Sequence, residues 1–181
     1  MSTEQTTHDR IAFLRGLRSV RAFRPDPVPQ QVIADILDVA RWSGSAKNLQ
    51  PWDFVVVHDR ATLETLGALE GYVTHLAGAT FVIVIVLANE GERTEQETFD
   101  DGKVSERMML AAAAHGVGSC IGWFHGTGRD EAKRILGVPS DHVLRTAISF
   151  GYPDEAALRA RPKPPEARKS LSKLVHLERY G

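Results

Sequence analysis

Apolar residues recur at helical spacing in three parts of the chain. One stripe predicts an amphipathic helix over Val28–Ser43, with Pro29 in its first turn, where a proline needs no N–H partner. Two further helices are predicted over Lys103–His115 and Arg129–Leu136, and a glycine, which commonly ends helices, follows each. The last two helices each lie between apolar runs that predict strands. The stripe of the first helix consists of Val32, Ile33, Ile36, Leu37 and Ala40.

Four apolar runs predict strands. Asp53–His58, Gly118–Phe124 and Val143–Tyr152 are short and lie between turn or helix signals. Thr80–Ala88 is apolar at almost every position, which predicts a central strand covered on both faces. Helices separate the strands at irregular intervals, so the pattern is compatible with an α+β or an α/β fold.

The end of the chain predicts a tail on a single domain spanning residues 1–181. The proline-rich segment 161–166 breaks any helix, and no long apolar pattern follows it, so about 154–181 is expected to be an extended arm. Its apolar residues are too few to form a core. From composition alone the arm either wraps around a partner subunit or packs back on its own chain. These residues are Leu171, Leu174, Val175, Leu177 and Tyr180.

Composition narrows the class of protein. A chain of 181 residues with a formal net charge of −1 fits one globular domain, and it argues against a nucleic-acid partner, which usually requires a basic excess. The N-terminus does not read as a secretory signal, and the longest apolar run is too short to cross a bilayer. We therefore expect a cytoplasmic protein without a membrane partner. Charge is segregated, because residues 90–106 are strongly acidic while both ends are basic.

Familiar catalytic motifs are absent from the sequence. It contains no HExxH, CxxC, GxSxG or GxxxxGK[ST] pattern, and its histidines are scattered, so no metal site is expected. The one cysteine, Cys120, lies in an apolar strand and is interpreted as a small buried hydrophobe. Trp42 and Trp52 are expected to be core residues, and Gln50 to satisfy backbone groups of its loop.

Three segments instead indicate recognition of an anionic, flat ligand. Arg18-Ser19-Val20-Arg21 provides two guanidinium groups and a hydroxyl, which suit a phosphate. The polar segment from Ser43 to Trp52 offers amides to the edge of a polar ring. The glycine-rich stretch Gly118–Gly128 lets backbone N–H groups approach a planar ligand closely. Each signal is weak alone, but together they indicate a phosphate contact, a polar edge contact and a close backbone approach.

Four stretches of the sequence, in family order, resemble the FMN-dependent nitroreductase family: LRSVRAFRPDPVP, ARWSGSAKNLQPWDFVVV, HGVGSCIGWF and GVPSDHVLRTAISFGYP. The final LVHLERYG is similar to the ends of shorter members. The resemblance implies an α+β fold with a central mixed or antiparallel sheet flanked by helices. It also implies an intertwined homodimer with FMN at the subunit interface and the C-terminal arm exchanged between subunits.

The resemblance also implies cofactor-binding residues at the phosphate end of FMN. Arg18 and Ser19 match residues that hold the phosphate and the ribityl chain. Arg168, followed by Lys169 and Ser170, matches a C-terminal basic phosphate contact.

Further matches concern the ring. Arg21 is expected near the pyrimidine edge, and Gly122 and Trp123 match a segment whose backbone amides approach N5 and O4. Ser45 and Asn48 are expected to reach the flavin from the other subunit.

Two positions depart from the family pattern. Leu17 stands where a second arginine is frequent, and Glu166 where a lysine is frequent. Phosphate binding would then depend on fewer cations, with Arg15 or Lys169 compensating. At about 1.5–3 kcal/mol per charged hydrogen bond, this would weaken FMN retention.

The implied activity is transfer of reducing equivalents from NADH or NADPH to nitroaromatic, quinone or similar acceptors by a ping-pong mechanism. The flavin carries the chemistry, so no catalytic acid or base is assigned, and Arg21 is expected to stabilise the reduced flavin. Two alternatives remain: other flavin chemistry, as in flavin-fragmenting dimethylbenzimidazole synthases or deazaflavin-using members, and a non-catalytic flavin-binding protein. The acidic stretch 90–106 is expected to disfavour anionic acceptors.

Overall fold

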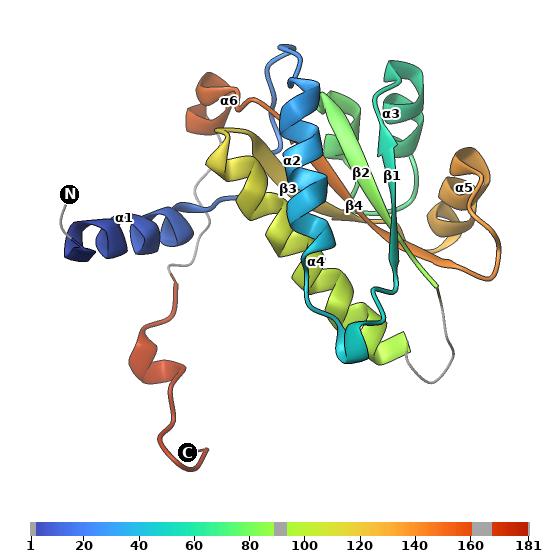
Figure 1. Ribbon diagram of the computed structural model, residues 1–181. Coiled ribbons are helices and arrows are strands. Elements are labelled where there is room, and N and C mark those ends of the chain that lie inside the picture. Colours follow the sequence, from blue (N-terminus) through green and yellow to red (C-terminus); the bar gives the residue numbers. More distant parts are fainter. Residues whose placement is uncertain (1–2, 89–93, 161–167, 181) are drawn as a thin grey trace.

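A four-stranded antiparallel sheet forms the centre of the computed structural model, which describes residues 3–88, 94–160 and 168–180. Its strand order is β1-β2-β4-β3, so β3 is an edge strand (Figure 1). All four predicted strands are present, with ends that lie within one residue of the predicted ones. Their bounds are β1 Trp52–Val57, β2 Phe81–Leu87, β3 Gly118–Trp123 and β4 Val143–Gly151.

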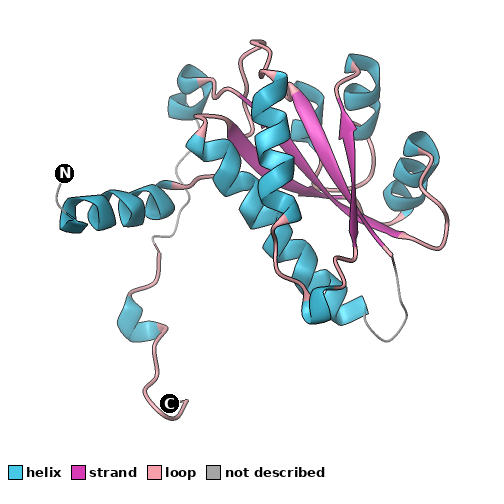
Figure 2. Ribbon diagram, in the orientation of Figure 1, coloured by secondary structure: helices cyan, strands magenta, loops and turns pink. Residues whose placement is uncertain are grey.

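Helices cover both faces of the sheet, which gives the α+β arrangement (Figure 2). On one face α2 (Gln30–Arg41) and α4 (Thr94–Ala114) pack against the sheet; on the other lie α3 (Arg60–Gly67), the 3-10 turn η2 (Thr74–Gly78) and α5 (Thr127–Leu136). Every residue of β2 is buried, as its continuous apolar run predicts.

Helix α4 begins nine residues before the predicted start, so much of the acidic stretch is helical. Three of its acids are buried, namely Glu97, Asp100 and Asp101. A run of acidic residues is usually a solvated face, but these three positions are not. Periodicity missed this part of the helix because its inward-facing residues are carboxylates rather than apolar side chains.

The chain ends differ from the expected plain arm. A short helix, α6 (Glu155–Ala160), begins the segment that was expected to be extended, and a 3-10 turn covers Leu171–Lys173. Helix α1 (Thr3–Gly16) and residues 168–180 project away from the sheet and its helices (Figure 1). The apolar side chains of the tail are exposed, as are Ile11, Phe13 and Leu14 of α1.

The two tryptophans that were expected in the core have different environments. Trp52 is buried in the core under α2 and α4, which confirms the prediction. Trp42 is 68% exposed at the end of α2, so the prediction for it is wrong. None of the helices in the described ranges combines the length and apolarity needed to cross a bilayer.

Two glycines should respond in opposite ways to alanine. Gly102 lies inside α4 with open space around its Cα, so Gly102→Ala should raise the free energy of unfolding by about 0.5–1 kcal/mol. A Cβ on Gly67 of α3 would lie 2.8 Å from the Cβ and backbone N of Ala77. Gly67→Ala should therefore lower the free energy of unfolding by about 1–3 kcal/mol. Urea denaturation of both variants measures this, and a stabilising Gly67→Ala would contradict the packing of α3 on η2.

Candidate functional site

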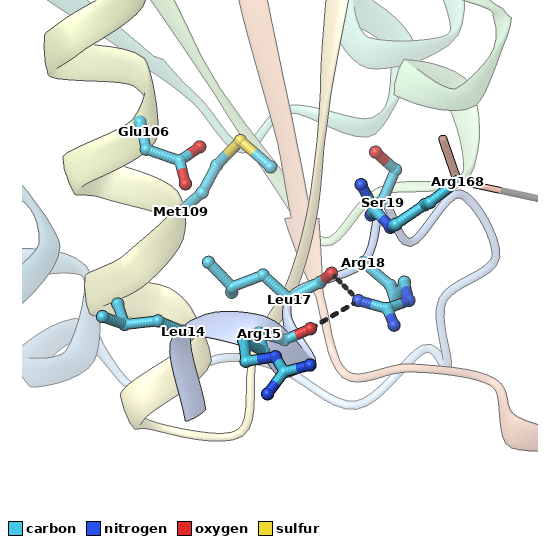
Figure 3. A pocket seen from close by; sticks show the side chains of 8 residues that line it. All are labelled: Leu14, Arg15, Leu17, Arg18, Ser19, Glu106, Met109 and Arg168. Carbon is cyan, nitrogen blue, oxygen red and sulfur yellow. Dashed lines mark hydrogen bonds between the residues drawn. The ribbon is translucent and has the colours of Figure 1, made fainter. Parts of the chain in front are cut away.

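A pocket of about 550 Å³ lies where α1, α4 and the start of the C-terminal tail meet (Figure 3). Two of the expected phosphate contacts, Arg18 and Arg168, line it together with Ser19. Its arginines make the pocket cationic, and one carboxylate, Glu106, lies on its α4 wall. Its other lining residues are Leu14, Arg15, Leu17 and Met109.

Contacts with the end of α1 fix the position of the Arg18 side chain. Its Nη1 donates hydrogen bonds to the carbonyl oxygens of Arg15 at 2.8 Å and Leu17 at 2.6 Å (Figure 3). Carbonyls at a helix end lack helical partners and carry partial negative charge, which favours a cation there. Among the described residues, Nε and Nη2 of Arg18 have no hydrogen-bond acceptor, so they remain available to an anion.

The segment after Arg18 lies along the outer edge of β3. The N–H of Val20 donates to the carbonyl of Ser119 at 2.8 Å, and Ser19 pairs with Ser119 as a parallel bridge. Gly118 makes this approach possible, because a Cβ there would lie 2.8 Å from the Val20 side chain. The pocket therefore begins at the first residues of β3.

The other expected contacts on β3 lie at its far end. The carbonyl of Trp123 accepts a hydrogen bond from the Tyr72 N–H at 2.8 Å, so this carbonyl faces the outer edge, as that of Ser119 does. Backbone groups of alternate strand residues point to one edge, so the N–H of Trp123 points there too. The Trp123 side chain is 48% exposed. The outer edge of β3 thus connects the cationic pocket with this exposed end.

His75 of η2 packs against this end of β3, and sequence reasoning did not select it. Its Nδ1 lies 2.8 Å from the Ser149 hydroxyl, and a Cβ on Gly122 would lie 3.0 Å from its Nε2. Burial is the main cause that lowers the pKa of His75, and the positive charge of Arg21 adds to it. Nearby carbonyls of Tyr72 and Ile121 oppose the shift. Only the tertiary fold brings these residues together, and no motif in the sequence marks them.

The remaining expected contacts do not line the pocket within one chain. Ser45 and Asn48 lie in the loop between α2 and β1, which contacts the first half of α4 through a hydrogen bond from the Ala46 N–H to Asp100 Oδ2 at 3.3 Å. Ser45 Oγ accepts a hydrogen bond from the Gln50 N–H at 2.8 Å. Gln50 Nε2 donates to the Asn48 carbonyl at 3.3 Å, which confirms the backbone role predicted for Gln50.

Three further expectations concern single residues and metals. Lys169 and Ser170 are exposed after Arg168, outside the pocket lining, whereas Leu17 lines the pocket and Glu166 falls outside the described residues. Cys120 is 1% exposed, which confirms its interpretation as a buried residue. Within the described ranges no group of histidine, cysteine, aspartate and glutamate residues could hold a metal ion.

Comparison with known proteins identifies the family. The model of the nitroreductase family matches residues 14–71 and 64–152. A putative NADH dehydrogenase/NAD(P)H nitroreductase of Archaeoglobus fulgidus is 30% identical over 142 residues, covering 76% of this chain and 82% of the relative. An NADH dehydrogenase of Thermus thermophilus is 31% identical over 173 residues, covering 76% of this chain and 83% of the relative.

A solved structure agrees. An FMN-dependent nitroreductase from Clostridium difficile superposes with a TM-score of 0.79 at 26% identity, covering 94% of this chain and 99% of the other. The fold and the site define an oxidoreductase with a cationic pocket beside an edge strand. The chain belongs to the nitroreductase family.

The lowered pKa of His75 predicts a pH effect on stability. A buried neutral histidine with a depressed folded pKa stabilises the protein above about pH 6.5, and this contribution is lost as the pH falls through the folded pKa. We expect the free energy of unfolding of wild type to fall more steeply as the pH drops below about 6.5 than that of His75→Gln, measured by urea denaturation. A variant of the exposed His8, His8→Gln, should follow wild type. Parallel curves for wild type and His75→Gln would refute the burial effect.

Proposed function

We propose that this protein is an FMN-dependent oxidoreductase that transfers reducing equivalents from NADH or NADPH to nitroaromatic, quinone or similar acceptors by a ping-pong mechanism. The observation that carries the proposal is the continuity between the Arg18–Arg168 pocket and the outer edge of β3. Its similarity to an FMN-dependent nitroreductase and to a putative NAD(P)H nitroreductase supports it.

The residues present fit a flavin phosphate. Arg18 has donors available, Ser19 offers a hydroxyl and Arg168 a second guanidinium, all on one pocket. Lys169 and Ser170 follow Arg168 directly and would add contacts to the same phosphate. Arg–phosphate pairs are among the strong hydrogen bonds, so this pocket is suited to hold the phosphate end of FMN.

The opposite end of the site fits a planar ring. Trp123 is four positions after Ser119, a distance of about 13 Å along the strand. His75 and the Tyr72 carbonyl occupy the space that a Gly122 side chain would fill, while the Trp123 N–H points to the outer edge, where it would donate to the ring. Arg21 supplies a positive charge near His75 and would stabilise negative charge on the pyrimidine side. FMN, when bound, supplies the electron transfer itself, while these residues bind and orient it.

A second copy of the chain completes the proposed site. Ser45 and Asn48 lie apart from the pocket of their own chain, so in our proposal they contact the flavin bound to the partner. The exposed apolar side chains of α1 and of residues 171–180 are the surfaces that such a homodimer would cover. In this assembly the tail exchanges between the subunits of a single-domain protein.

The test of the proposal is the spectrum of the purified protein with added FMN. Flavin bands that remain with the protein after gel filtration and bleach anaerobically with NADH or NADPH, then return with a quinone, are the expected result. Bound flavin that no nicotinamide donor reduces would overturn the reductase proposal. Absence of FMN binding would overturn the site.

Replacing Arg18 should weaken the binding of FMN. Arg18→Ala removes the available guanidinium donors, so the Kd for FMN should rise by about 10- to 100-fold, which corresponds to roughly 1.5–3 kcal/mol for a charged hydrogen bond. Flavin fluorescence titration measures it. Arg134→Ala removes an arginine paired with Glu131 on α5, across the sheet, and should leave the Kd unchanged. Equal affinities for wild type and Arg18→Ala would exclude the phosphate role.

Arg21 should affect reduction more than binding. Arg21→Ala removes the positive charge proposed to face the pyrimidine, so anaerobic reduction of the FMN-loaded protein by NADH should slow by about tenfold or more. Stopped-flow absorbance in a single turnover measures this, with Arg134→Ala again as control. An unchanged rate at full flavin occupancy would remove Arg21 from the mechanism.

A further inference from the structure

A β-bulge in β4 changes the direction of one charged side chain. The register to β2 pairs Leu144 with Val86 and Thr146 with Ile85, so Arg145 is an extra residue without a partner on that strand. Side chains of successive strand residues normally point to opposite faces, yet Arg145 and Thr146 both reach the carboxylate of Asp101 on α4. Bulges redirect side chains in this way, and they occur often beside active sites.

The redirected guanidinium lies at the exposed end of β3. Its central carbon is 4.9 Å from the centre of the Trp123 ring, a cation–π contact, and its Nη2 is 3.9 Å from Asp101 Oδ2. The Arg145 side chain is 26% exposed. The contact to Asp101 is too long for a hydrogen bond, and in the described part of the chain the Arg145 guanidinium has no hydrogen-bond acceptor. Arg145 is thus fixed in place with its donors available.

Other groups satisfy Asp101. Thr146 Oγ1 donates to its Oδ2 at 2.6 Å, and Ser105 Oγ donates to its Oδ1 at 3.4 Å. Burial raises the pKa of Asp101, and the Thr146 hydrogen bond opposes this shift more than the charge of Arg145 does. Asp101 therefore positions Arg145 without forming a tight ion pair that would use its donors.

The carboxylate of Asp100, next to Asp101, has partners other than Arg145. Asp100 is buried and paired with Lys103 at 3.1 Å, and it also accepts from the Ala46 N–H.

We propose that Arg145 binds the anionic group of a substrate that enters the site, a carboxylate or a phosphate. The proposal rests on the proposed function, because Trp123 marks the end of β3 where the ring would lie. A planar guanidinium with available donors forms bidentate hydrogen bonds with either group. The group is either the carboxylate of an electron acceptor or a phosphate of the nicotinamide dinucleotide. In this proposal Arg145 makes the enzyme prefer anionic substrates over neutral ones.

Kinetics of the FMN-loaded Arg145→Gln variant test this proposal with matched substrates. The acceptor pair is 4-nitrobenzoate and neutral nitrobenzene; the donor pair is NADH and 1-benzyl-1,4-dihydronicotinamide, which carries no phosphate. We expect the KM of at least one anionic substrate to rise about tenfold or more, with the KM of its neutral counterpart within about twofold. A rise for 4-nitrobenzoate assigns an acceptor carboxylate, and a rise for NADH assigns the dinucleotide phosphates. Equal changes for charged and neutral substrates would overturn the proposal.

A binding measurement on wild type keeps the test independent of turnover and of the folding of the variant. Benzoate titrated into FMN-loaded wild type should shift the Trp123 indole N–H resonance, assigned with Trp123→Phe, while benzamide should not. The same titration of Arg145→Lys should show weaker binding, because lysine keeps the charge but lacks the planar fork. No benzoate-dependent shift of Trp123, together with unchanged kinetics, would exclude Arg145. A wild type that binds FMN but is reduced by neither NADH nor NADPH refutes the proposed function instead.

Discussion

Pairing of the Ser19–Val20 backbone with the outer edge of β3 determines where the proposed cofactor contacts lie. The hydrogen bond from the Val20 N–H to the Ser119 carbonyl places Arg18 close to the start of β3. The absence of a side chain at Gly118 permits this close approach. From that point the strand itself sets the distance to Trp123. A phosphate contact and a ring contact are therefore linked by one rigid element rather than by flexible loops.

The order of the strands explains why this edge is available. β2 and β4 are internal, and helices α2 and α4 on one face and α3 and α5 on the other bury the sheet. Backbone groups on the outer side of β3 have no neighbouring strand, and within the described ranges Val20 and Tyr72 pair with its two ends. In our proposal FMN lies along this edge while the core remains closed.

Two carboxylates of α4 connect this helix to other parts of the structure. Asp100 joins the 43–50 loop to α4, and Asp101 joins α4 to the bulge in β4. Both acids lie in a helix that also lines the cationic pocket through Glu106 and Met109. Helix α4 therefore contacts three parts of the proposed site: the phosphate pocket, the 43–50 loop that is proposed to reach the partner's flavin, and Arg145.

The sequence by itself determined the four strands, the amphipathic helix α2 and the grouping of Arg18 with Ser19, because periodicity and adjacent residues are local properties. It also predicted a close backbone approach to a planar ligand over Gly118–Gly128, the stretch that begins with β3. It could not reveal that Glu97, Asp100 and Asp101 are buried, that Trp42 is exposed, or that α3 covers the sheet, since short or polar segments carry no clear apolar period. Only the tertiary structure brought Arg168 to Arg18, His75 to Gly122 and Arg145 to Trp123. These contacts join residues far apart in the chain, and strand register, a bulge and helix packing decide them.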